Sequence, residues 1–187
     1  MATNELSRLA PAVERQTTPD GARDTWGSPI IQEDLKFVVG KPVHFEETRH
    51  YEFKEVMGRN PVDSIKNTCD EYVVAFLNAE GGRILWGIRN ADRCVVGVKL
   101  HANERDHLRR LVIDQLLKIR PPVAPTAYRI SLHPVYADDV STEPLPDLFI
   151  VEILAPSSDS FLLHATGGNE IYVRTDAGKK KLTPEEI

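Results

Sequence analysis

Residues 75–88 of the chain read AFLNAEGGRILWGI, and the main elements of the fold can be predicted outward from them. The segment before it predicts a helix, because Asn60 is a favourable N-cap and Pro61 suits the first helical turn. Its apolar side chains recur at helical spacing and form one stripe: Val62, Ile65, Cys69, Tyr72, Val73, Phe76 and Leu77. The pair Gly81-Gly82 ends this helix, and the apolar run over 83–88 predicts a buried strand directly after it.

The residues on either side of this unit add further elements. Tyr51 and Phe53 alternate with Glu52 and Lys54, which predicts a half-buried strand over 50–56. Downstream, the polar turn 89–93 lies between apolar runs, so we expect a hairpin with a second strand over 94–98.

The second half of the chain contains one more helix and several strands. Asn103 is the expected cap of a helix that ends before Pro121-Pro122. We expect strands over 127–136 and 148–154, and a hairpin whose strands are 161–164 and 171–174. The order of elements predicts an α+β fold: a mixed, mostly antiparallel sheet with two main helices packed on it.

Length and composition predict one domain. The chain has 187 residues, of which 41% are hydrophobic, and only two cysteines. We expect residues 1–28 to be a mobile arm and 29–187 to form the domain, which the helix-start signals at the C-terminus suggest is truncated. No signal peptide or membrane-spanning run is present, so we expect a cytoplasmic protein.

The net charge of −5 argues against a nucleic-acid partner at first sight. The charge is unevenly distributed, however. Residues 81–120 contain nine Lys and Arg against four Asp and Glu, a local excess of +5. Local charge rather than the average therefore decides which partners the surface attracts.

The segment 46–55, EETRHYEFKE, is dense in charge. Glu47 and Glu52 are five residues apart, so a continuous strand would point them to opposite faces, and they converge only if Glu47 lies on the loop before the strand or across a bulge. Converging carboxylates hold divalent cations, which activate water against a phosphodiester, and Lys54 could neutralise a phosphate oxygen. The alternative interpretation is a solvated charged face.

Together these residues resemble a known family. The spacing of Glu47, Glu52, Phe53 and Lys54, followed by 75–88 and then Val95-Val96-Gly97, is similar to the Schlafen family and its prokaryotic Alba-like (AlbA_2) relatives. The closing Tyr172-Val173-Arg174 also looks like the family pattern. The resemblance implies an Alba-like domain that engages nucleic acid. It further implies a three-acid site that, in vertebrate Schlafens, cleaves structured RNA such as transfer RNA with a divalent metal.

Carried over by position, the resemblance makes Glu47 and Glu52 the metal ligands, for Mg²⁺ or Mn²⁺, with Lys54 as a phosphate or transition-state stabiliser. The third acid is replaced by Asn90, and Asp92 in the same turn is the candidate substitute. The vertebrate zinc site needs His and Cys positions that are absent, so we expect no zinc.

Basic side chains are candidates for contacts to the nucleic-acid backbone. They are Arg49, Arg89, Arg93, Arg109, Arg110, Lys179 and Lys180. We expect RNA, or DNA, as the partner, no membrane, and a homo-oligomer, a dimer being favoured because one lobe makes a small cradle for a folded RNA. Two functions follow from these features: a binding domain that is a candidate metal-dependent endoribonuclease, or a catalytically inactive binding or assembly module of a longer regulator.

Overall fold

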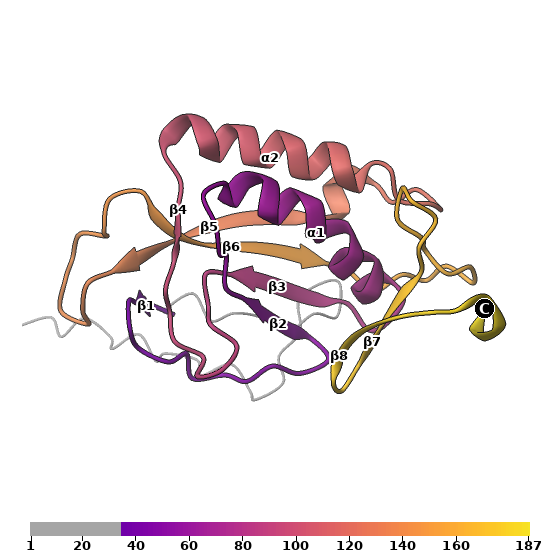
Figure 1. Ribbon diagram of the computed structural model, residues 1–187, viewed down its shortest axis with the longest axis horizontal. Helices are drawn as coiled ribbons and strands as arrows, with labels where there is room; N and C mark the ends of the chain where they lie inside the picture. Colours follow the sequence, from indigo (N-terminus) through magenta and orange to yellow (C-terminus); the bar gives the residue numbers. More distant parts are fainter. Residues whose placement is uncertain (1–34) are drawn as a thin grey trace, which may run out of the picture.

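The computed structural model describes residues 35–187, and its two helices cover one face of a curled sheet (Figure 1). In chain order the elements are β1 (Phe37–Val38), β2 (Tyr51–Lys54), α1 (Pro61–Leu77), β3 (Gly82–Trp86), β4 (Val98–Lys99), α2 (Ala102–Leu116), η1 (Pro125–Ala127), β5 (Arg129–Tyr136), β6 (Leu148–Ala155), β7 (Tyr172–Thr175), β8 (Gly178–Lys181) and η2 (Pro184–Glu186). The predicted α+β class is confirmed. The expected mobile arm, residues 1–28, lies outside the described residues.

The main sheet is mixed and mostly antiparallel. Its strand order is β1-β5-β6-β3-β2, and β4 also pairs with β6. The pairs β1–β5 and β2–β3 are parallel, whereas β3, β4 and β5 each run antiparallel to β6. Parallel neighbours need a crossover, and α1 supplies the one between β2 and β3. A separate hairpin, β7–β8, lies at the end of α1 (Figure 1).

The helix α1 forms where the sequence predicts it. The Asn60 side chain caps the Asp63 N–H, and Pro61 occupies the first turn. The cap of α2 differs from the expected Asn103. His101 is the N-cap residue, and the Glu104 carboxylate accepts its backbone N–H at 2.8 Å. The Glu104 side chain, in the third helical position, reaches back to this N–H, and the expected cap Asn103 lies inside the first turn.

Apolar side chains fill both faces of the sheet. Ile84 and Trp86 of β3 face the two helices, and Leu85 between them faces the opposite cluster with Phe53 and Ile150. Each such side chain, when fully buried, contributes about 1.5–3 kcal/mol to the free energy of unfolding. All five residues of β3 are buried, so this strand is the centre of both clusters.

Close packing requires glycine at two positions, 82 and 97. A Cβ at Gly82, whose φ is +155°, would lie 2.5 Å from the Phe76 ring and 2.7 Å from the His50 carbonyl oxygen. At Gly97, with φ +74°, a Cβ would lie 2.6 Å from Leu148 Cγ. A side chain at either position would therefore separate elements that the fold holds together.

The two expected hairpins are formed differently from the prediction. After β3 only one bridge, Ile88–Val95, follows the predicted pairing, because the chain turns at Gly97 and residues 98–99 pair with β6 instead. The expected strand over 161–164 is absent among the described residues. β7 instead pairs with β8 across a two-residue turn, a shorter and more local connection.

No helix in the part of the chain that the structure describes is both long and apolar enough to cross a membrane.

Candidate functional site

Glu47 lies on the loop that leads into β2, and a tight turn folds it back beside the strand. Thr48 and Tyr51 close this turn with two backbone hydrogen bonds of 3.2 and 3.4 Å. The Glu47 carboxylate thereby reaches the outer edge of β2, where its Oε1 accepts the Phe53 N–H at 2.8 Å. Because β2 is the last strand of the sheet, this N–H has no strand partner. Glu47 therefore acts as a cap on the sheet edge.

Glu52 lies on the face of β2 opposite to Phe53 and is buried, with 6% of its surface exposed. Both of its carboxylate oxygens are bound by cations. Arg174 Nη1 lies 2.5 Å from Oε2, and Lys54 Nζ lies 2.9 Å from Oε1. Burial acts to lower the pKa of Lys54, but the hydrogen bond and the charge of Glu52 together raise this pKa above its ordinary value. The three side chains form a closed ionic cluster.

Arg174, which comes from β7, is the centre of that cluster. Besides Glu52 it donates hydrogen bonds to the carbonyl oxygens of Thr48, Arg49 and Tyr51, at 2.7, 3.3 and 3.4 Å. Its guanidinium also lies 5.0 Å from the centroid of the Phe76 ring. Sequence reasoning assigned Arg174 no role, although the segment 172–174 carries part of the family pattern. Arg174 fixes the turn that places Glu47.

Asn90, at the third position of the acidic pattern, approaches the first. Its Nδ2 lies 3.4 Å from Glu47 Oε1, a long hydrogen bond. Asp92, the candidate substitute, is bound within its own turn, where it accepts the Cys94 N–H at 3.0 Å and pairs with Arg89 at 2.8 Å. The Cys94 N–H is the main reason that the pKa of Asp92 is lowered. The structure thus joins Glu47 and Asn90 and keeps Asp92 in a separate set of contacts.

The surroundings of the two expected metal ligands, Glu47 and Glu52, suit a divalent cation poorly. Within residues 35–187, no group of three or more His, Cys, Asp and Glu side chains could hold a metal ion. A divalent ion at Glu52 would have to displace a guanidinium whose side chain is 2% exposed. The third donor would be the uncharged amide of Asn90. The donor set present here therefore fits a hard divalent cation poorly.

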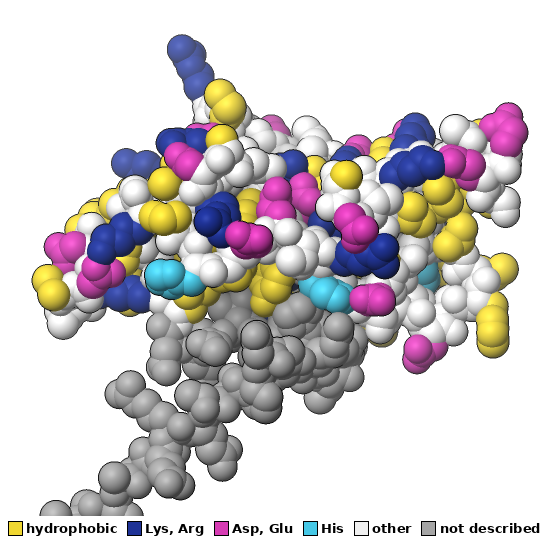
Figure 2. All heavy atoms as spheres, turned by 90° about the horizontal axis from the view of Figure 1, so that it is seen from below, with side chains coloured by type: hydrophobic (Ala, Val, Ile, Leu, Met, Phe, Trp, Pro, Cys, Tyr) yellow, Lys and Arg dark blue, Asp and Glu magenta, His cyan; other side chains and the backbone are white. Residues whose placement is uncertain are grey.

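Most of the predicted backbone-binding residues already have acidic partners. Six of the seven form ion pairs within the domain: Arg49–Asp176, Arg89–Asp92, Arg93–Glu46, Arg109–Asp106, Lys179–Glu71 and Lys180–Glu186. Arg110 has no such partner among the described residues. Figure 2 shows the same mixture, with basic and acidic side chains interspersed over the face seen from below. Five of these pairs are exposed, so each of the five is weak and open to competition from a phosphate, whereas Lys179–Glu71 is half-buried.

The two halves of the expected basic rim lie apart. The 89–93 turn is tied to residues 40–43, because Val43 N–H donates to the Arg93 carbonyl and Pro42 bridges Cys94. Figure 1 shows this turn at the lower edge of the molecule and α2 at the upper edge. Arg89 and Arg93 therefore do not share one rim with Arg109 and Arg110.

Two comparisons with known proteins give matches. The model of the family described as Schlafen, AlbA_2 matches residues 47–183. Among solved structures, the chain is similar to the DIP2311 protein from Corynebacterium diphtheriae, with 15% sequence identity and a TM-score of 0.49. That match covers 72% of this chain but only 25% of the other.

Proposed function

The chain belongs to the Schlafen AlbA_2 family, and from this we propose that it binds the phosphate backbone of RNA without cleaving it. Family membership supports a nucleic-acid-related function. The resemblance of residues 47–54 and 75–97 to the family pattern favours structured RNA, such as transfer RNA, as the partner. Phosphate contacts of this kind position a nucleic acid without reading its bases.

The observation that carries the absence of cleavage is the pairing of Glu52. A metal-dependent nuclease needs carboxylate oxygens that are free to bind the ion. Both oxygens of Glu52 are held by cations, Arg174 and Lys54, within a buried cluster. Removing one partner from such a cluster costs about 3–5 kcal/mol, and a metal ion bound at Glu52 would have to offset this cost.

The experiment is a binding and cleavage assay on one sample. The wild-type chain and the Asn90→Asp variant are incubated with transfer RNA in Mg²⁺ or Mn²⁺, and the RNA is run on native and denaturing gels. We expect both proteins to shift the RNA and leave it intact. If the RNA also stays intact with Asn90→Asp, the pairing of Glu52 rather than the missing third acid prevents cleavage. RNA that is not shifted at all overturns the proposed binding.

A second candidate function, a metal-dependent endoribonuclease, is favoured by one contact. The amide of Asn90 lies beside Glu47, so the first and third positions of the acidic pattern are neighbours. In that case metal-dependent cleavage should appear with the wild-type chain and disappear in Glu52→Gln. Glu52→Gln is suited to this test because it removes the charge and keeps the size of the side chain.

We also propose that two chains pair on a folded RNA, since one lobe of this size covers only a small part of it. The mass of the complex with transfer RNA, measured by light scattering, tests this. Two protein chains per RNA are expected, and a single chain per RNA would contradict it.

A further inference from the structure

A hollow of about 350 Å³ lies where the chain enters the two helices. One wall is the segment between β2 and α1, with Val56, Gly58 and Arg59, and the other is the segment from Gly97 to His101. Figure 1 shows these two segments side by side as they rise into the starts of α1 and α2. Gly58 has φ +109° and open space where a Cβ would be, so the backbone itself borders the hollow.

Two cations of this hollow have no acidic partner. Arg59 and Lys99 are both exposed, and neither side chain forms an ion pair or a hydrogen bond with any residue that the structure describes. They come from opposite walls of the hollow. This separates them from the six paired cations described above, whose charge is already balanced within the domain. An anion placed between Arg59 and Lys99 would meet two uncompensated positive charges.

The acidic groups nearby are already engaged. Glu104, which lines the same hollow, uses one oxygen to accept the His101 N–H at 2.8 Å. Asp147 is paired with the His101 ring, its Oδ2 lying 2.8 Å from Nδ1. Neither carboxylate contacts Arg59 or Lys99. The lining therefore carries two cations, Arg59 and Lys99, against one carboxylate, Glu104, and its net charge is positive.

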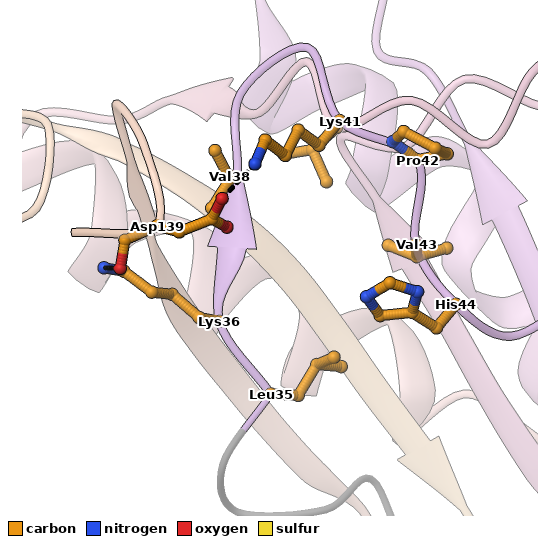
Figure 3. Close-up of a pocket in the computed structure, with 9 residues that line it drawn as sticks. Leu35, Lys36, Val38, Lys41, Pro42, Val43, His44 and Asp139 are labelled. Carbon is orange, nitrogen blue, oxygen red and sulfur yellow. Dashed lines mark hydrogen bonds and ion pairs between the residues drawn. The ribbon is translucent and has the colours of Figure 1, made fainter. Parts of the chain in front are cut away.

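A second hollow, of about 300 Å³, provides the contrast. It is lined by Lys36, Lys41 and Asp139, among others, and Figure 3 shows both lysines directed toward Asp139. Lys41 forms an ion pair with the Asp139 carboxylate, and Lys36 donates to the carbonyl oxygens of Asp139 and Ser141. Its two cations are satisfied internally, as those of the first hollow are not.

We propose that the hollow between Arg59 and Lys99 binds one phosphate group of the RNA backbone. This inference rests on the proposed function and gives it a location. The planar fork of Arg59 suits two phosphate oxygens, and Lys99 adds a compact charge from the opposite wall. The volume accommodates a phosphate with part of its nucleotide and is too small for a duplex. The Glu52 cluster, by contrast, presents no free charge to a phosphate.

The experiment compares matched double variants of the full chain. Arg59→Gln/Lys99→Gln removes two cations whose side chains have no partner, and Lys36→Gln/Lys41→Gln removes two whose side chains are bound within the domain. Both variants lower the net charge equally. Binding to fluorescent transfer RNA is measured by anisotropy over a range of salt concentrations. We expect the first variant to bind about tenfold more weakly and its salt slope to shrink by about 1, the contribution of one phosphate contact. The second should stay within twofold of wild type.

Two competitors separate the sources of phosphate. Inorganic phosphate and a nucleoside monophosphate are titrated against the bound RNA at constant ionic strength, and an RNA fragment is the third arm. We expect only the RNA fragment to compete below millimolar concentration, because a single phosphate lacks the neighbouring backbone contacts. Displacement by inorganic phosphate at such low concentration would assign the hollow to a free phosphate and overturn the inference.

The remaining outcomes are equally decisive. If both double variants weaken binding by the same factor, net charge alone is responsible and the hollow is not a site. If wild type and Arg59→Gln/Lys99→Gln bind equally, the hollow is excluded while RNA binding itself stands. If the wild-type chain does not bind RNA, the proposed function fails and the inference fails with it. Thermal melting of both variants verifies that they are folded.

Discussion

The cluster around Glu52 and the hollow between Arg59 and Lys99 differ in whether their charges are paired. In the cluster, a buried carboxylate has both oxygens bound by Arg174 and Lys54. In the hollow, two exposed cations have no acidic partner among the described residues. The cluster uses its charges to join β2 to the β7–β8 hairpin, whereas the hollow leaves its charges available to a ligand.

This difference shows that charge density in a sequence does not indicate which charges are available. Residues 46–55 are dense in charge, because seven of the ten are Glu, Arg, His or Lys, yet the structure binds Glu47, Glu52 and Lys54 internally. Arg59 and Lys99 are isolated in the sequence and unremarkable there. We therefore expect changes in the cluster to alter stability and changes in the hollow to alter binding.

The largest effect is expected from Arg174→Met. This substitution leaves Glu52 buried beside Lys54 alone and removes three hydrogen bonds to the turn at residues 48–51. The free energy of unfolding, measured with urea, should fall by about 3 kcal/mol, as for other buried ion pairs that lose one partner. Loss of less than about 1 kcal/mol would mean that the cluster does not hold the hairpin.

A second variant separates the charge from the packing. Arg174→Lys keeps a positive charge beside Glu52 but lacks the planar fork that reaches several carbonyl oxygens. Its stability should lie between those of wild type and Arg174→Met. If Arg174→Lys equals wild type, the contacts to the turn contribute nothing and only the charge matters.

A smaller effect is expected at Asp70, a buried acid on α1 whose 2.8 Å partner is the neutral amide of Gln115. Burial raises the pKa of Asp70 above 3.8, so the folded state binds this proton more tightly than the unfolded state. The stability cost of its charge is therefore fully present at pH 7 and disappears as the pH falls through the raised pKa. Asp70→Asn should stabilise the protein by about 1 kcal/mol at neutral pH.

The pH dependence supplies the control for Asp70→Asn. At a pH below 3.8, the wild-type carboxyl is protonated in both states and the two proteins should have equal stability. A difference between them that is the same at every pH would show that the amide acts through packing rather than through charge.

The smallest effect is expected from Glu104→Gln, on the wall of the hollow. The amide oxygen still accepts the His101 N–H, so the start of α2 is preserved. Removing one negative charge beside Arg59 and Lys99 should tighten RNA binding about twofold at low salt. Weaker binding in Glu104→Gln would contradict the view that the ligand of this hollow is an anion.

Local signals in the sequence predict the helices and the central strand. Asn60, Pro61 and the glycine pair 81–82 mark the ends of α1 to within four residues, because caps and glycines act on residues close to them. The pairing of β4 with β6 and the β7–β8 hairpin are not predicted. Strands of two to four residues carry too little pattern to specify a partner, and β4 lies 49 or more residues from β6 in sequence.

For the candidate site, the sequence predicts the position of Glu47 but not the partners of Glu47 and Glu52. The condition that Glu47 must lie on the loop before β2 is fulfilled by the turn at Thr48 and Tyr51. The partner of Glu52 is Arg174, 122 residues away, and a contact at that separation is set by the topology rather than by any local pattern. The ion pairs of the basic residues are unpredictable for the same reason.

The most direct test measures RNA affinity in two variants side by side: Glu52→Gln in the cluster and Arg59→Gln/Lys99→Gln in the hollow. Both are titrated with transfer RNA at one salt concentration, after melting curves have verified that they are folded. We expect Glu52→Gln to bind as tightly as wild type and Arg59→Gln/Lys99→Gln to bind about tenfold more weakly. Loss of binding in Glu52→Gln, with unchanged binding in Arg59→Gln/Lys99→Gln, would contradict this expectation.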